Sequence, residues 1–286
     1  MHRRASSPAP SPPAQSNSDY AGGLARAFGG AVIFSLPMLM TMEMWFLGFY
    51  MDRFRLLLLF ILNFVVLTGL SRFSGFEPTV RLVDDIMDAL AAVAVGVIAS
   101  AVVLGIFGIL DAQMPFNEIF GKIVVQCVPA SFGAMIARKQ LAGAKDQETE
   151  DAAEAEAGYG GQLFLMMAGA LFLAFNVAPT EEMILIGFKM TPWHSLALVM
   201  LSILLLHAFV FGVGFPGQED TPEGTTFNAR FFGYTVTGYA IALLTSLFVL
   251  WTFGRTDGAG LQQIATMTIV LGFPAAVGAA IARLVV

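Results

Sequence analysis

Charged residues are scarce in this sequence. Asp, Glu, Lys and Arg make up 13% of its 286 residues, whereas hydrophobic residues make up 57% and the mean hydropathy is +0.74. Soluble proteins carry about 25% charged residues, so this chain has too few charges to cover a surface in water. The composition therefore predicts an integral membrane protein, and an all-α one because its apolar runs are as long as membrane-spanning helices.

Cysteine and basic residues are also few. A single cysteine, Cys127, excludes a disulfide-stabilised fold. The 21 acidic residues outnumber the 15 Lys and Arg residues and no basic stripe is present, which argues against nucleic-acid binding. The sequence contains no H-E-x-x-H, G-x-S-x-G or P-loop motif and no Cys/His metal spacing. We therefore expect no enzyme activity, and no cofactor other than a bound cation.

Eight apolar runs could cross a membrane as helices, since a bilayer core about 30 Å thick needs about 20 helical residues. They cover residues 28–49, 56–71, 89–110, 119–137, 163–186, 195–215, 231–253 and 264–281. The preceding stretch, residues 1–19, is rich in Ser, Pro and Ala and is predicted to be a disordered tail.

The two halves of the chain resemble each other. A shift of 139 residues aligns Glu43 and its surroundings with Glu182 and its surroundings. Near the end of each half, PASFGAMIAR (129–138) and PAAVGAAIAR (274–283) share seven of ten residues. This agreement predicts a tandem duplication of a four-helix unit. The predicted units are residues 20–138 and 159–286, joined by an acidic linker at 139–158.

The even number of spans in each unit returns the chain to the side from which it started. Both units then have the same orientation, and we expect a pseudo-two-fold axis along the membrane normal to relate them. With the N-terminus in the cytoplasm, most of the 15 Lys and Arg residues lie on the cytoplasmic side, as the positive-inside rule requires. Both termini and the acidic linker are then cytoplasmic. The linker could bind a cation or a basic partner, although a solvated tether is the simpler interpretation.

The candidate site is built around two acids, Glu43 and Glu182, at equivalent positions of the two units. Each is expected within about 4–7 Å of the membrane midplane, where an unpaired carboxylate costs several kcal/mol. Pro37 and Pro179 precede these acids and are predicted to break the helix and expose carbonyl oxygens. If the acids face each other, their oxygens could bind a proton or a cation, with a Ca²⁺-like divalent slightly preferred. The predicted ligands are Glu43, Glu182, Glu181, Thr41, Thr180 and Asn176. The alternative is that the acids only hold helices together or reach the outer interface.

Other polar residues allow more than one interpretation. Asp111 and Asp257 end an FG-x-x-D motif in each half, where they could guard an outer vestibule or cap a turn. Lys122 is expected to pair with Glu118 one turn earlier, and His207 to form a hydrogen bond inside a helix rather than relay protons. The alternating Met residues near position 40 could bind Cu(I), but most of them are absent from the second half, which favours packing.

The segment LPMLMTMEMW (36–45), together with the chain length and the tandem hydrophobic units, resembles a bacterial family of integral membrane proteins to which no activity is assigned. The resemblance implies a multi-pass protein of the bacterial inner membrane and implies nothing about its activity.

These observations lead to a hypothesis of function: a cation transporter or channel that uses Glu43 and Glu182. One alternative is a non-transporting scaffold or accessory subunit that binds a partner through the acidic linker. Another is a transporter of a small solute or a lipid. The expected partners are the lipid bilayer and an inorganic cation or proton. The sequence is also compatible with a homo-oligomer.

Overall fold

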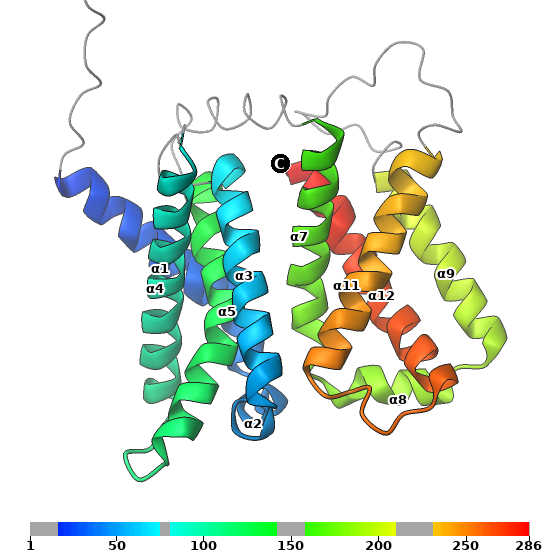
Figure 1. Cartoon of the computed structure of the whole chain (residues 1–286), viewed down its shortest axis with the longest axis horizontal. Helices are drawn as coiled ribbons and strands as arrows, with labels where there is room; N and C mark the ends of the chain where they lie inside the picture. Colours follow the sequence, from blue (N-terminus) through cyan, green and yellow to red (C-terminus); the bar gives the residue numbers. More distant parts are fainter. Residues whose placement is uncertain (1–16, 75–80, 142–157, 210–230, 286) are drawn as a thin grey trace, which may run out of the picture.

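The computed structural model describes residues 17–74, 81–141, 158–209 and 231–285. Within these ranges the chain forms helices and no strand, as expected for an all-α membrane protein. The first half contains α1 (Asn17–Leu39), α2 (Met42–Tyr50), α3 (Arg53–Ser74), α4 (Leu82–Ile106) and α5 (Phe116–Leu141). The second half contains α7 (Tyr159–Val177), α8 (Glu181–Lys189), α9 (Pro192–His207), the π-helix η2 (Phe231–Val236), α11 (Thr237–Thr252) and α12 (Leu261–Val285) (Figure 1).

Seven helical segments of the described chain are long and apolar enough to cross a membrane. They are α1, α3, α4, α5, α7, η2 continued by α11, and α12. Where the sequence predicts an eighth span at 195–215, the structure has the shorter apolar helix α9, of 16 residues. The last residues of that predicted span lie outside the described ranges.

Each half contains a break after its first long helix. α1 is followed by the short helix α2, and α7 by the short helix α8. Pro37 lies in the last turn of α1, and Pro179 lies between α7 and α8. A proline lacks the N–H that continues the helical ladder, and its ring clashes with the preceding turn. The apolar runs 28–49 and 163–186, in which the sequence predicts a break at the proline, are thus two helices each in the structure.

The last helix of each half is the one on which the other helices of that half pack. α5 contacts α1, α2, α3 and α4, and α12 contacts α7, α8, α9 and α11. Of the seven membrane-length segments, α5 has the largest buried share. α5 and α12 therefore fix the positions of the neighbouring helices in their halves.

A pair of glycines brings two helices into close contact in each half. Gly30 of α1 faces Gly133 of α5, and Gly169 of α7 faces Gly278 of α12. A Cβ atom on Gly133 would lie 2.5 Å from the carbonyl oxygen of Gly30, and a Cβ atom on Gly278 would overlap the carbonyl of Gly169. Small residues allow helix backbones to approach in a membrane, where dispersion contacts hold helices together.

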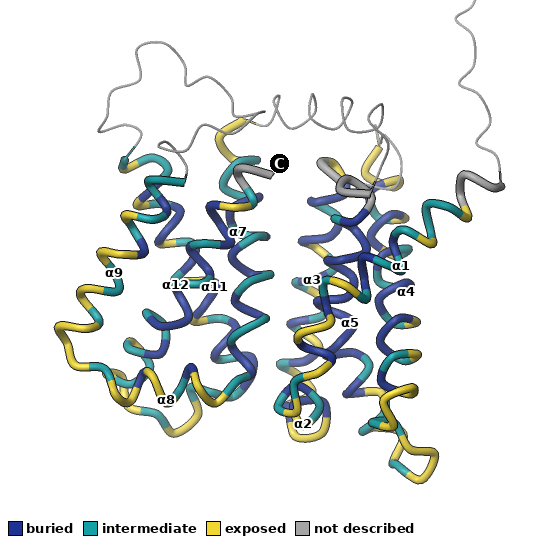
Figure 2. The backbone as a smooth tube through the Cα atoms, turned by 180° about the vertical axis from the view of Figure 1, so that it is seen from behind, coloured by how far each residue is buried: buried dark blue, intermediate teal, exposed yellow. Residues whose placement is uncertain are grey.

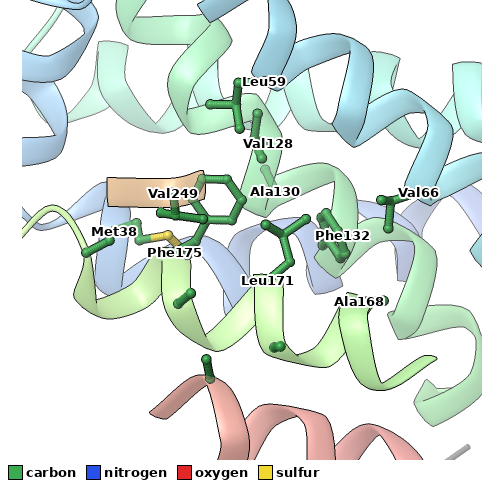
Figure 3. Close-up of a cluster of buried hydrophobic side chains, with 14 of the residues drawn as sticks. Met38, Leu59, Val66, Val128, Ala130, Phe132, Ala168, Leu171, Phe175 and Val249 are labelled. Atoms are coloured by element: carbon green, nitrogen blue, oxygen red, sulfur yellow. The ribbon is translucent and has the colours of Figure 1, made fainter. Parts of the chain in front are cut away.

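The two halves meet mainly where α3 and α5 lie against α7 and α11, and Phe34 of α1 also contacts Phe172 of α7. Figure 3 shows Leu171 and Phe175 of α7 pointing toward Ala130 and Phe132 of α5, and all four side chains are at most 2% exposed. The buried apolar residues of the two halves thus form one continuous core.

The contacts between the halves do not follow the pseudo-two-fold axis expected from the sequence. In the sequence alignment of the halves, α3 and α5 correspond to α9 and α12, and α1 and α4 correspond to α7 and α11. A two-fold axis would therefore add contacts of α9 and α12 with α1 and α4 to the observed contacts of α3 and α5 with α7 and α11. Among the described residues, no comparable contact joins those helices. In both Figure 1 and Figure 2, α9 and α4 lie at opposite outer sides of the molecule.

The predicted tail at 1–19 and the linker at 139–158 fall mostly outside the described residues. Residues 17–19 and 139–141 are helical, since α1 begins at Asn17 and α5 continues to Leu141, and Gly158 is the N-cap of α7. The sequence therefore placed the end of the tail and the start of the linker within helices.

We predict that Gly278→Val destabilises the protein, because the new side chain would overlap the backbone of α7. Overpacking of this kind costs about 1–3 kcal/mol, which should lower the unfolding temperature of the detergent-purified protein by a few degrees, measured by tryptophan fluorescence. Gly105→Val is the control, since a Cβ atom there meets nothing within 4 Å. Equal unfolding temperatures for the two variants would show that the glycine crossing is not tight.

Candidate functional site

The candidate acids lie in the first turns of the two short helices. Glu43 is half-buried in α2, whereas Glu181 and Glu182 open α8 and are exposed. The parts of α1 and α7 that precede them are each 19 residues long and could cross a membrane alone, since such a helix measures roughly 28 Å. The acids thus follow the end of a span. The sequence instead predicts a position near the membrane midplane for them.

Side chains satisfy the backbone carbonyls freed by the break after α1. Thr41 Oγ1 donates to the carbonyl of Pro37 at 2.6 Å, and Gln126 Nε2 of α5 donates to that of Met38 at 3.0 Å. Trp45 Nε1 donates to the last carbonyl of α1 at 2.8 Å. Carbonyl oxygens that were expected to face an ion are therefore occupied by donors of the protein itself.

The break after α7 is satisfied in a similar way by different residues. Thr180 Oγ1 donates to the carbonyl of Val177 at 2.8 Å, and the guanidinium of Arg255 donates to the carbonyl of Pro179. Asn176 Nδ2 donates to a carbonyl one turn earlier in α7 at 2.9 Å. The expected neutral ligands Thr41, Thr180 and Asn176 thus all stabilise the helix ends near the breaks.

The described residues bring together no multi-carboxylate site. No group of three or more His, Cys, Asp or Glu side chains among them could hold a metal ion. Within the same part of the chain, Glu43, Glu181 and Glu182 have no hydrogen-bonding or ion-pair partner for their side chains. Their position at the start of a helix is nevertheless favourable, because the positive end of the helix dipole stabilises a carboxylate.

The repeated FG-x-x-D motif ends a helix in both halves. Gly108 and Gly254 have φ values of 70° and 73°, the left-handed conformation that glycine adopts readily. The N–H of the following residue then bonds a carbonyl five residues earlier, at 2.9 Å in both halves. Asp111 Oδ1 accepts a hydrogen bond from the backbone N–H of Gln113 at 3.0 Å. Asp111 therefore caps a turn, as one of the two interpretations of this motif expects.

Asp257, the equivalent acid, instead joins the two halves. Arg55 of α3 donates to both of its carboxylate oxygens, at 2.8 and 2.9 Å, and also to the carbonyl of Trp251 at 2.9 Å. The guanidinium carbon lies 4.9 Å from the centre of the Trp251 ring. We call Arg55, Trp251 and Asp257 the clamp. It connects the start of α3 with the end of α11 and the loop after it.

Sequence reasoning missed the clamp, because Arg55 and Asp257 are 202 residues apart. The available signal is an arginine at the start of an apolar span, since such a charge needs a partner at the edge of the membrane. The expected pairing of Lys122 with Glu118 is present at 2.7 Å. His207 Nδ1 lies 2.8 Å from Thr235 Oγ1 and so forms the hydrogen bond expected for it.

Comparison with known proteins identifies a family to which the chain is similar. A family model described as "Putative integral membrane protein (DUF2391)" matches residues 23–286. No curated protein and no solved structure matches the chain.

We predict that the clamp makes stability depend on pH. The hydrogen bond from Arg55 is the main reason why the pKa of Asp257 lies below its ordinary value. The stabilisation is then complete above the ordinary carboxyl pKa of about 4 and is lost as the pH falls through the lowered pKa. Native protein should unfold at a higher temperature than Asp257→Asn at pH 7, and this difference should shrink in acid. Asp111→Asn is the control, because an amide oxygen can still cap the turn. A difference that does not change with pH would exclude the ion pair as its cause.

Proposed function

This chain belongs to the DUF2391 family of integral membrane proteins, and we propose that it is a cation transporter built from two tandem repeats of four spans each. The proposal places it in a bacterial inner membrane, with both termini in the cytoplasm, and assigns it no enzymatic reaction. The acids Glu43 and Glu182 would attract the cation at one mouth of the protein.

The repeat is supported by equivalent contacts in the two halves. α5 and α12 are related by a sequence shift of 145 residues, and each packs on the other helices of its half. The glycine pairs also correspond: Gly30 and Gly133 of the first half align with Gly169 and Gly278 of the second. Gly108 and Gly254, both with a left-handed backbone conformation, follow the ends of equivalent helices. Four spans per repeat would include α9 as the shortened member of the second set.

The two acids at equivalent helix breaks are the observation that carries the transport proposal. α2 and α8 lie at the same end of the molecule (Figure 1). No described residue neutralises Glu43 or Glu182, so each break adds negative charge to that end. Charge of one sign around a mouth raises the local concentration of the opposite ion.

Two separate half-sites fit these observations better than one shared site. Ca²⁺ requires about six to eight oxygen ligands, whereas the carbonyls and hydroxyls around each break are already engaged in hydrogen bonds. A carboxylate in each half suits a proton or a monovalent cation better than a divalent one. We therefore rank protons and monovalent cations ahead of the Ca²⁺-like ion that the sequence favours.

The test is ion flux into proteoliposomes that contain the purified protein. Under an imposed gradient of K⁺, Na⁺, Ca²⁺ or protons, we expect saturable flux of at least one ion. The double variant Glu43→Gln/Glu182→Gln should lower this flux by about tenfold, which corresponds to about 1.4 kcal/mol of lost cation stabilisation. The amides keep the size of the side chains, so the fold should persist.

Asp52→Asn is the matched control, because Asp52 is an exposed acid next to α2 whose oxygen caps the backbone of Arg55, a role that an amide also fills. Full flux in the double variant would remove the acids from the mechanism. If the native protein moves none of these ions, cation transport is wrong. The scaffold alternative then predicts a co-purifying partner that is lost when residues 140–157 are deleted.

A further inference from the structure

The contact between the halves buries one face of α7 under the first half of the chain. Leu171 is 2% exposed and Phe175 1%, and both point toward α5 in Figure 3. Phe175 also packs on Phe253 of its own half, with ring centres 5.6 Å apart. Phe172 packs edge-on against Phe34 of α1, with ring centres 5.7 Å apart. Gly69 of α3 lies directly against the ring of Phe164 of α7. A face of α3 thus fits a face of α7.

The equivalent faces of α1 and α9 are exposed in the part of the chain that the structure describes. In the proposed repeat, Leu36 of α1 is equivalent to Phe175 and is 41% exposed, and Ile33 is equivalent to Phe172 and is 63% exposed. On α9, Leu201 is equivalent to the half-buried Leu62 of α3 and is 45% exposed. Figure 2 shows exposed residues along much of α9. Apolar residues are ordinary on a lipid-facing surface, so it is the equivalence with buried faces that points to a protein partner.

The polar end of the contact has an open equivalent as well. In the repeat, His194 at the start of α9 takes the place of Arg55, and Asp111 takes the place of Asp257. Both are exposed. His194 Nδ1 accepts a hydrogen bond from the backbone N–H of Thr191 at 3.2 Å, so a neutral ring carries its proton on Nε2. That N–H can donate to a carboxylate, as the guanidinium of Arg55 does.

We propose that the occupant of these faces is a second copy of this chain, with α9 of each copy lying on α1 of the other. The proposal rests on the tandem repeat argued above. A contact between unlike faces, such as α3 on α7, can be repeated, and it closes into a ring when the rotation allows. A ring made of two chains contains four halves. The α9–α1 contact then occurs twice, with the second copy's Asp111 opposite His194.

Cysteine cross-linking tests this arrangement at the equivalents of Gly69 and Phe164, which are Ala208 and Ala25. Two differently tagged chains, one with Ala25→Cys and one with Ala208→Cys, are co-expressed in membranes and treated with a short bifunctional thiol reagent. We expect a cross-linked species that carries both tags. The native Cys127 is 0% exposed and should contribute little background.

The matched control pairs Ala25→Cys with Leu204→Cys. Leu204 is 62% exposed on α9, and its equivalent on α3, Val65, is 57% exposed, so this position lies away from the contact in both halves. Cross-linking of Ala208→Cys should exceed that of the control several-fold. Gly69→Cys/Phe164→Cys in one chain should cross-link internally and so calibrates the geometry.

Three results would overturn the proposal: cross-linking no greater than in the Leu204→Cys control, a link formed within a single chain that carries both Ala25→Cys and Ala208→Cys, or a monomer by light scattering in mild detergent. Each of these readouts is independent of ion flux. A dimer without flux would therefore leave this inference standing while the transport proposal fails, and a monomer with flux would do the reverse.

Discussion

The rest of the structure depends on the close crossing of the first and last long helices in each half. In lipid, apolar side chains gain nothing by leaving their surroundings, so helices associate through dispersion contacts that weaken quickly with distance. Gly30 with Gly133, and Gly169 with Gly278, let the backbones approach to a distance that any side chain would prevent. This approach positions α5 and α12, and the other helices of each half pack on these two.

The glycine crossings also constrain the helix breaks that follow. Because α1 and α7 are held against the last helix of their half, the chain after each proline remains beside α5 or α12. A broken helix at the edge of a membrane is tolerated only when its free carbonyls find donors. Gln126 of α5 supplies one of these donors in the first half, and Arg255 supplies one in the second. The acids are thereby left at the start of α2 and α8, where the helix dipole favours them.

Much of this fold could be predicted from local properties of the sequence. Hydropathy identified the apolar spans, and Pro37 and Pro179 marked positions at which a helix cannot continue. Hydropathy could not place Glu43 in a short helix of its own, because it does not distinguish one long span from a span followed by a short helix. The clamp was missed because nothing local connects Arg55 with a carboxylate 202 residues away. The contacts of a two-fold axis were expected but are not found for a related reason: sequence similarity between the halves does not determine which of their faces meet.

The differences between the halves follow from how they meet. Positions that pack inside each half keep their residue type, as the four crossing glycines do. At the contact between halves, Arg55 corresponds to His194 and Phe172 to Ile33, whereas Asp257 corresponds to another aspartate, Asp111. Where an arginine lies against Trp251 and pairs with Asp257, two charges support each other at the edge of the membrane. His194 offers one ring N–H with which to donate to the carboxylate of a second chain. The same fold, used once within a chain and once between chains, would need this difference, because only the first contact is always formed.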